Sequence, residues 1–260
     1  MIEGNVAEGA FHIDPVSQFA IHKVVPLEVA GFDISYTNSA LFMSIGTLLV
    51  VALFLIATRK RELIPGRGQT AAEAAYGTIK NIVKDNAGHE ALAYFPLVFS
   101  LFFFVLMGNL LGMIPGSFTY TSHIAVTLAL AGVLFVGITG IGFARHGLHF
   151  FSRFLPSGVP LVLAPMIFIL EVISYLMRPV TLAVRLFANM LAGHMVLKVF
   201  AYFALGLITS GSAAYMVLGI APLAVNVALI ALEFFVAVLQ AFIFTILTCV
   251  YLRDALVIEH

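Results

Sequence analysis

The sequence predicts an all-α integral membrane protein with about five transmembrane helices. The mean hydropathy is +1.08, and only 10% of the 260 residues are charged. About 20 consecutive apolar residues cross the hydrocarbon core of a bilayer, and several runs in this chain reach or exceed that length. The runs that predict the five spans are 38–58, 92–114, 123–144, 160–208 and 214–252.

A chain of this length is expected to form one domain, so we expect a single transmembrane domain over residues 1–260. It would consist of an outer N-terminal segment (1–37), a helical membrane region (38–252) and a cytoplasmic tail (253–260). Lys and Arg are concentrated in the cytoplasmic loops of membrane proteins. Lys23 alone falls on one side of the predicted spans, and the other side holds Arg59, Lys60, Arg61, Arg67, Lys80, Lys84, Arg145, Arg153 and Arg253. The N-terminus is therefore expected outside, and the C-terminus in the cytoplasm.

The composition argues against several other functions. The formal net charge is zero and no basic run is present, so nucleic acid is not an expected partner. Cys249 is the only cysteine and cannot form a disulfide within the chain. Because no phosphate-binding loop of the P-loop type occurs, we expect neither nucleotide chemistry nor a cofactor in this chain.

The segment between the first two spans has the pattern of an amphipathic helix. Apolar residues recur at helical spacing, whereas charged and polar residues take the other face. The apolar set is Ala72, Ala75, Tyr76, Ile79 and Val83, and the polar set is Glu73, Lys80, Asn81 and Lys84. A helix lying on the inner membrane surface fits this pattern, and a solvated connecting helix fits it equally well.

The last two apolar runs are too long to cross a membrane upright. As straight helices, residues 160–208 and 214–252 would extend for roughly 70 and 60 Å, about twice the hydrocarbon thickness. Steep tilting, a kink at Pro165 or Pro179, or a re-entrant start would resolve the mismatch. We favour a strongly tilted antiparallel hairpin that lies against another curved surface, with its turn formed by Gly206, Gly211 and Ser212.

Polar residues recur along one face of each of these two helices. In the last helix Asn226, Glu233 and Gln240 are seven residues apart, which keeps them within about 20° per step. In the preceding helix the corresponding face carries Glu171, Ser174, Arg178, Arg185 and Asn189. His194 points about 180° away from Arg185 by the same helical geometry. A hairpin folded about residue 211 would bring Asn189 nearly level with Glu233.

Each polar residue has a structural interpretation beside a functional one. Asn109, Asn226 and Gln240 are each typical of hydrogen bonds between membrane helices. Arg178 can pair with Glu171, or its long side chain can place the charge at the membrane–water interface. Lys198 can also reach that interface with its charge. His194 is either a satisfied interhelical histidine or, with Glu233, an imidazole–carboxylate pair that relays protons, and we favour the relay.

Arg185 is the most informative of these residues. A guanidinium near the centre of a bilayer costs roughly 2.5 to 17 kcal/mol, depending on the reference state, and ordinary pH does not neutralise it. That cost indicates a function. The structural alternative is an arginine–glutamate ion pair that holds the hairpin together.

Three motifs in this sequence resemble the a subunit of F-type ATP synthases. They occur in the family's order and lie mainly within 107–123 and 165–253. The motifs are Gly108 to Pro115 (GNLLGMIP), Arg185 to His194 (RLFANMLAGH), and Leu239 to Phe244 (LQAFIF) with Leu247-Thr248 and Val250-Tyr251-Leu252. The first 37 residues contribute little to the resemblance.

The resemblance implies roles for individual residues. Arg185 matches the stator arginine that faces the carboxylate of the rotating c ring. Asn189 and Gln240 match polar positions near that arginine. His194 and Glu233 match two channel positions, one acidic and one basic, that the family fills in either order. Histidine comes first here, as in mitochondrial and alphaproteobacterial members, so the individual roles of the two residues stay open.

The implied function is that of the membrane stator of ATP synthase. Two proton half-channels would be kept apart by Arg185 against the c ring, coupling proton flow to ATP synthesis, while other subunits carry out the nucleotide chemistry. The outer path would pass His123, Asn226, Glu233 and His194, and the inner path would run from the Arg185 face toward Glu171, Arg178 or the inner loop. The implied partners are the c ring, peripheral-stalk b subunits and the lipid bilayer. The implied location is the bacterial inner membrane, as a multi-pass protein.

Two other functions fit Arg185. A self-contained secondary transporter would use it as a midplane anion site, but such proteins usually contain internal repeats, and we detect none. A structural scaffold would use it as an internal ion-pair partner. The sequence is compatible with translocation of protons or of sodium, and we favour protons. It is also compatible with an enzyme that mainly makes ATP and with one that mainly hydrolyses it.

Overall fold

The computed structural model describes residues 19–26, 28–29, 32–33, 35–59, 64–114, 116–154 and 163–257. Most of the expected outer segment, the last residues of the tail and the start of the fourth apolar run lie outside these ranges. Within them, five helical segments are long and apolar enough to cross a membrane. They are Asn38–Ala57, Glu90–Gly112, Ile124–Phe154, Ala164–Ile208 and Ala213–Leu256. The predicted all-α membrane fold is confirmed.

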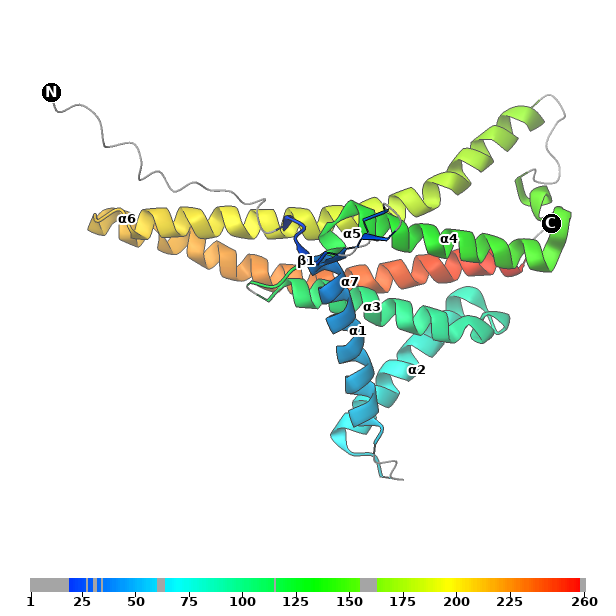
Figure 1. Cartoon of the computed structure of the whole chain (residues 1–260), viewed down its shortest axis with the longest axis horizontal. Coiled ribbons are helices and arrows are strands. Elements are labelled where there is room, and N and C mark those ends of the chain that lie inside the picture. Colours follow the sequence, from blue (N-terminus) through cyan, green and yellow to red (C-terminus); the bar gives the residue numbers. More distant parts are fainter. Residues whose placement is uncertain are drawn as a thin grey trace.

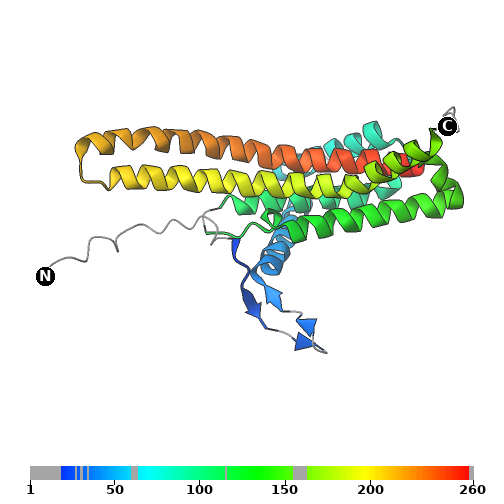
Figure 2. The same cartoon turned by 90° about the horizontal axis from the view of Figure 1, so that it is seen from above.

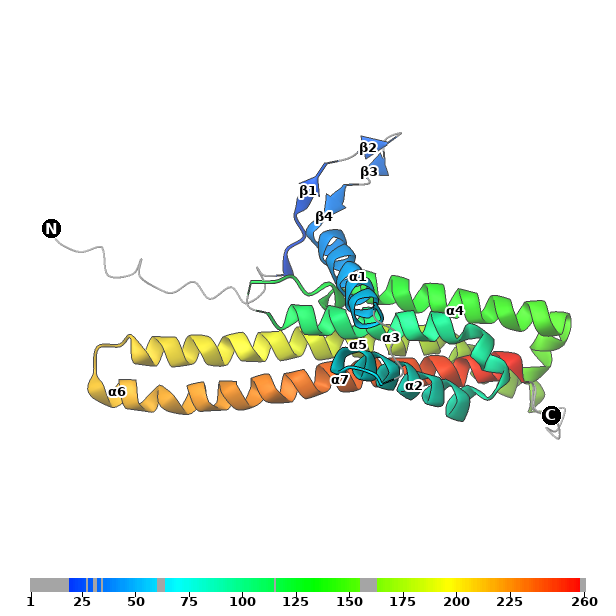
Figure 3. The same cartoon turned by 90° about the horizontal axis from the view of Figure 1, so that it is seen from below.

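A small β region precedes the first span, and the sequence did not reveal it. The short strands β1 (Lys23–Val25) and β4 (Tyr36–Thr37) pair antiparallel, as do β2 (Glu28–Val29) and β3 (Phe32–Asp33). Two- and three-residue strands are too short to show an alternating pattern. They extend beyond the N-terminal end of α1 (Asn38–Ala57), as Figure 3 shows.

The predicted amphipathic helix is α2 (Arg67–Ala87), which packs beside α7. Its apolar face joins a buried cluster with the C-terminal part of that helix, through Ile79, Val83 and Leu252 among others. Tyr76 remains 46% exposed, although its ring lies 4.7 Å from that of Phe95. The apolar face of α2 therefore packs against protein.

The middle of the chain forms two spans and two short connections. The α3 span begins after a turn of 3-10 helix, and the α4 span ends in another. In order these elements are η2 (Glu90–Tyr94), α3 (Phe95–Gly112), η3 (Tyr120–Ser122), α4 (Ile124–His146) and η4 (Gly147–Phe154). The connection that contains η3 packs against α5.

The last two spans form the long antiparallel hairpin that the sequence predicts. The helices α5 (Ala164–Ile208) and α7 (Ile220–Leu256) lie side by side, joined by a turn and the short α6 (Ala213–Leu218), as Figures 1 and 2 show. Gly211 adopts φ of 76°, which suits glycine at the turn, whereas Gly206 lies inside α5. The 45 residues of α5 extend for roughly 70 Å.

The hairpin runs across the direction of α1, as expected of a strongly tilted element (Figure 1). The N-terminal part of α5 bends away from the remainder of the helix. Pro179 lies inside α5 and can produce this bend, whereas Pro165 lies in the first turn, where proline is tolerated. Of the two proposed kink positions, only Pro179 is therefore in a place to kink the helix.

The main core lies where α3, α4, α5 and α7 meet. It contains Val105, Ala131, Leu186, Met190 and Phe244, all at most 1% exposed. Small residues such as Ala183 and Ala241 let the helices approach closely here. This core determines which face of α5 turns inward and which face stays exposed.

Candidate functional site

Arg185 lies on the exposed face of α5. Its side chain is exposed, whereas that of the next residue, Leu186, is 0% exposed in the core. No hydrogen bond or ion pair joins Arg185 to another residue that the structure describes. An internal ion pair of Arg185, the structural alternative, is thus not seen in the described part of the chain.

Asn189 lies one turn beyond Arg185 and connects the two long helices. Its Nδ2 donates a hydrogen bond of 2.9 Å to Oε1 of Gln240, whose side chain is buried. The expectation that Asn189 lies level with Glu233 is wrong: it contacts a residue two turns farther along α7. Because α6 lengthens the connection on one side, residue 211 is not the centre of the hairpin.

His194 and Glu233 form the predicted imidazole–carboxylate pair on the inward side of the hairpin. His194 Nδ1 lies 3.4 Å from Glu233 Oε1, and the two side chains are 11% and 6% exposed. Neither carboxylate oxygen accepts a hydrogen bond from a described residue. A Cβ atom at Gly193 would lie only 2.7 Å from Glu233 Oε1, so this glycine makes room for the carboxylate.

The connection between α3 and α4 supplies a third member that the sequence did not reveal. Thr119 Oγ1 lies 3.2 Å from His194 Nε2, and both residues are buried. The imidazole thus has Glu233 on one ring nitrogen and Thr119 on the other. The two positions are 75 residues apart, and no motif links them.

His123 lies in the same connection, immediately before the α4 span. Its ring stacks on Phe118 with centroids 4.9 Å apart and an interplanar angle of 18°. Burial lowers the pKa of His123 below its usual value. Its Nε2 is buried and has no hydrogen-bond partner among the described residues.

The remaining asparagines differ in their environments. Asn109 Nδ2 donates to the carbonyl of Ala237 at 3.1 Å, which confirms an interhelical hydrogen bond. Asn226 is half-buried on α7, and its Oδ1 has no partner within the described ranges. The structure does not bring Asn226 into contact with His194.

A cavity of about 270 Å³ lies between α5 and α7. Its polar lining comes from Asn189 and Glu233, and most of the remaining wall is aliphatic. The cavity therefore connects the buried carboxylate with the part of α5 that carries Asn189. Space of this size can hold several water molecules beside polar groups.

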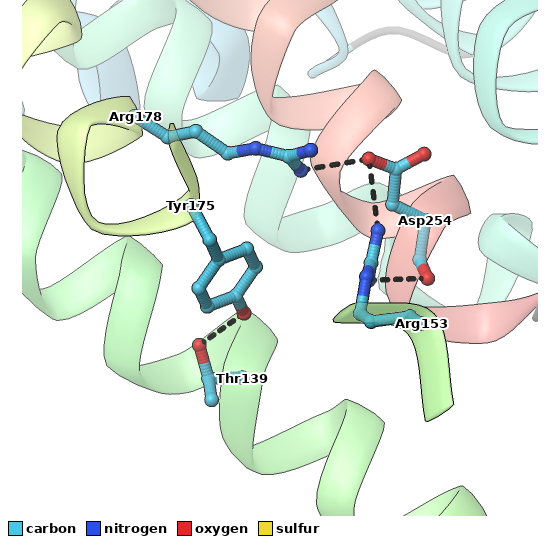
Figure 4. A network of polar contacts seen from close by, with 5 residues as sticks. All are labelled: Thr139, Arg153, Tyr175, Arg178 and Asp254. Atoms are coloured by element: carbon cyan, nitrogen blue, oxygen red, sulfur yellow. Dashed lines mark hydrogen bonds and ion pairs between the residues drawn. The ribbon is translucent and has the colours of Figure 1, made fainter. Parts of the chain in front are cut away.

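Arg178 takes part in a separate network near the C-terminal end of α7, shown in Figure 4. Its Nη1 lies 2.7 Å from Oδ2 of Asp254, and Arg153 Nη2 lies 3.2 Å from the same oxygen. The prediction that Arg178 pairs with Glu171 is wrong. Asp254 forms the ion pair with Arg178, and Glu171 lies exposed on α5. The sequence analysis did not identify Asp254, which lies beyond the last apolar run.

Aromatic side chains surround this network. The Arg178 guanidinium lies 5.3 Å from the ring centroid of Tyr175 and 5.0 Å from that of Tyr251. Tyr175 also shares a hydrogen bond of 2.7 Å with Thr139 of α4 (Figure 4). The network therefore connects η4, α4 and the N-terminal part of α5 to the end of α7.

These features define a multi-pass membrane protein with ionisable groups both inside and on the face of a long hairpin. A family model described as ATP synthase A chain matches residues 40–253, and the chain belongs to this family. It is thus a proton-translocating subunit of the membrane-embedded Fo sector of ATP synthase, which works with a c ring.

Individual relatives agree over nearly the whole chain. The chain is 53% identical over 242 residues to ATP synthase subunit a of Rhodospirillum rubrum, covering 93% of this chain and 98% of the relative. Identity to the Parvibaculum lavamentivorans subunit a is 50% over 249 residues, or 95% of each chain. Identity to subunit a of Rhizobium etli strain CIAT 652 is 50% over 248 residues, which are 94% of this chain and 97% of the relative. These bacterial relatives and the apolar helices indicate a multi-pass protein of the inner membrane.

Proposed function

We propose that this chain is the stator of the proton path, with Arg185 separating two half-channels that open to opposite sides of the membrane. The observation that carries this proposal is the position of Arg185. It is exposed on the long hairpin and makes no hydrogen bond or ion pair with a described residue. A permanent charge in that position is available to a neighbouring subunit.

The charge of Arg185 suits a barrier between half-channels. An excess proton about 4 Å from a fixed positive charge is repelled by roughly 4 kcal/mol at an effective dielectric constant of about 20. Protons would therefore be prevented from passing directly between the half-channels. A membrane potential then contributes about 2.3 kcal/mol per charge per 100 mV to movement through the rotor.

The same charge acts on the partner. A guanidinium favours the ionised form of a carboxylate that approaches it. A proton-carrying carboxylate of the c ring would release its proton when it reaches Arg185 and take up another after it has passed. Arg185 thereby binds each carboxylate in turn without being consumed or changing its own charge.

The outer half-channel would begin near His123 and reach the His194–Glu233 pair. The cavity between α5 and α7 then leads from Glu233 toward Asn189, one turn from Arg185. Asn226 lies nearer the N-terminus of α7 than Glu233, close to the end of the hairpin where α6 is. Of these groups, Glu233 and His194 can each hold and pass a proton, and the polar amides can orient water between them.

The inner half-channel would lie beside the N-terminal part of α5. Glu171 is exposed there and can accept a proton that leaves the rotor. Arg178 does not serve this path directly, because Asp254 already binds its guanidinium. Its role in this proposal is to position the N-terminal part of α5.

Several finer statements belong to the same proposal. The chain would act as one transmembrane domain, with its N-terminus outside, its C-terminus in the cytoplasm and peripheral-stalk b subunits beside it. It would translocate protons rather than sodium and take no part in nucleotide chemistry. A strongly tilted hairpin presents its length along the side of a rotor, which suits the contact with successive ring subunits.

Replacement of Arg185 tests the proposal. In inverted membrane vesicles that contain the whole enzyme, Arg185→Ala should abolish ATP-driven proton pumping while the amount of assembled enzyme stays normal. Val184→Ala is the matched control, because Val184 is the adjacent residue and is 42% exposed. Normal pumping by a fully assembled Arg185→Ala enzyme would refute the proposal.

The position of the rotor can be tested independently of pumping. Cysteines placed on the exposed face of α5 near Arg185 should crosslink to the c subunit in the whole enzyme, whereas a cysteine at buried Ala183 should not. Equal crosslinking from both faces would contradict the proposed arrangement.

A further inference from the structure

We propose that Thr119 positions His194 for proton transfer by binding the ring nitrogen that does not face Glu233. This inference rests on the proposed function of the His194–Glu233 pair. Thr119 Oγ1 and His194 Nε2 lie 3.2 Å apart, within hydrogen-bonding distance, and Thr119 is only 5% exposed. The imidazole therefore lies between a hydroxyl within hydrogen-bonding distance of one ring nitrogen and a carboxylate oxygen 3.4 Å from the other.

The position of Thr119 is built by close packing at the end of α3. A Cβ atom at Gly112 would lie 2.3 Å from Thr119 Oγ1, so only a glycine there lets the threonine side chain approach the helix. The hydroxyl of Ser122 donates to the carbonyl of Thr119 at 2.6 Å. Next to it, Tyr120 donates to the carbonyl of Phe104 at 2.7 Å. The segment that carries Thr119 is thereby tied to α3 and to η3.

A hydroxyl is suited to both states of a relaying imidazole. A neutral imidazole has one donor and one acceptor nitrogen, and a threonine hydroxyl can serve either of them. When His194 Nδ1 donates toward Glu233, Thr119 donates to Nε2. When the proton is on Nε2 instead, Thr119 accepts a hydrogen bond from Nε2, and Nδ1 can accept one from the protonated carboxyl group of Glu233. The ring keeps the same orientation in both cases.

The surroundings of His194 show why a positioning group matters. The titratable and charged groups that act on it are Glu233 from α7 and Lys198 from its own helix. The aromatic ring of Phe19 lies 6.4 Å from the imidazole on another side. Among the described residues, only Thr119 is a neutral hydrogen-bonding partner of the ring. Without that hydroxyl, the ring would be free to turn away from Glu233.

The chain offers a close control at Thr121. This residue belongs to the same connection and is 1% exposed, but its hydroxyl has no hydrogen-bond partner among the described residues. Thr121→Val therefore removes a buried hydroxyl from the same segment without touching His194. Thr119→Val removes the hydroxyl that binds the imidazole, and Thr119→Ser retains a hydroxyl there.

The three variants are compared in the whole enzyme in inverted membrane vesicles, with rates expressed per assembled enzyme. Thr119→Val should reduce the initial rate of ATP-driven proton pumping by about two- to tenfold, the factor that one hydrogen bond typically contributes. It should also shift the dependence of that rate on pH. Thr119→Ser should restore both properties, and Thr121→Val should match the unchanged enzyme.

A second measurement asks whether Thr119 acts through His194. In a His194→Gln background, Thr119→Val should cause no further loss, because the group that it positions has gone. Should valine lower the amount of assembled enzyme, Thr119→Ala is compared with Thr119→Ser by the same criteria. An unchanged rate and pH profile in Thr119→Val, or equal losses in Thr119→Val and Thr121→Val, would overturn the inference.

The outcome can be separated from that of the proposed function. If Arg185→Ala abolishes pumping but Thr119→Val does not alter it, only the role of Thr119 is wrong. If the assembled Arg185→Ala enzyme pumps normally, the stator proposal itself fails, whatever the threonine variants do.

Discussion

Asp254 at the C-terminal end of α7 binds Arg178 of α5 at 2.7 Å, and so one of the two arginines of α5 is paired with a carboxylate within the chain. The other, Arg185, lies two turns farther along the helix on the exposed face. The two cations therefore have different surroundings, although both lie in the same apolar run. Arg178 holds helices together, and Arg185 is open to a partner.

Removal of the Asp254 carboxylate should destabilise the end of the hairpin. Asp254→Asn leaves Arg178 and Arg153 without their shared counter-ion, which should cost roughly 1–3 kcal/mol for these partly buried contacts. The loss of stability is measured by heating the purified enzyme and recording the temperature at which this subunit is released. Arg178→Met in the Asp254→Asn background should add little, and full additivity of the two changes would contradict the pairing.

Substitution of Gly193 should impair proton translocation without altering a charged group. An added Cβ at this position meets Glu233 Oε1 at 2.7 Å, so Gly193→Ala should displace the carboxylate from His194. We expect slower ATP-driven pumping in an assembled enzyme. Gly206→Ala is the control, because a Cβ there meets no atom within 4 Å and alanine favours a helix by about 1 kcal/mol. Equal effects at the two glycines would argue against a displaced Glu233.

Exchange of the two members of the buried pair tests their coupling. His194→Glu combined with Glu233→His places an imidazole and a carboxylate at the same two positions, which lie 3.4 Å apart in the unchanged chain, so the double change should cost less activity than either single one. A double-mutant cycle of pumping rates measures this coupling. Additive losses would indicate that His194 and Glu233 act separately.

Protonation of His123 should destabilise the connection between α3 and α4 at acidic pH. Burial lowers the pKa of His123 in the folded protein below the usual 6.5, so the unfolded chain binds a proton more readily. Its contribution to stability is present above pH 6.5 and is lost as the pH falls toward the lower folded value. Thermal unfolding of the purified enzyme from pH 8 to pH 5 should therefore depend less on pH in His123→Gln. An unchanged slope below pH 6.5 would contradict this expectation.

The interhelical hydrogen bond beside Arg185 should matter for translocation more than for assembly. Asn189→Leu removes the donor to Gln240 and leaves a buried amide without its partner, at a cost of about 1–3 kcal/mol. ATP-driven pumping per assembled enzyme should fall, because the α5 segment next to Arg185 is no longer tied to α7. Asn226→Leu, which breaks no contact to α5 among the described residues, should cause a smaller loss.

The amino-acid sequence by itself determined the membrane class, the five spans, the long hairpin and the opposite faces of Arg185 and His194. These properties depend on apolar run length and on a rotation of about 100° per residue, both of which are local. The pairing of His194 with Glu233 was favoured from the sequence over a satisfied interhelical histidine, and the structure places the two side chains 3.4 Å apart. The three motifs that resemble the family lie within these same segments.

Only the tertiary structure decided which distant side chains meet. Thr119 reaches His194 across 75 residues, and Asp254 rather than Glu171 binds Arg178, because the packing of whole helices brings them together. The hydrogen bond between Asn189 and Gln240 depends on how far α6 lengthens the connection between α5 and α7. The hydrophobic periodicity of the sequence does not contain that length. Periodicity gives the direction of a side chain around its own helix, whereas its partner depends on the relative shift and tilt of neighbouring helices, which the packed core determines.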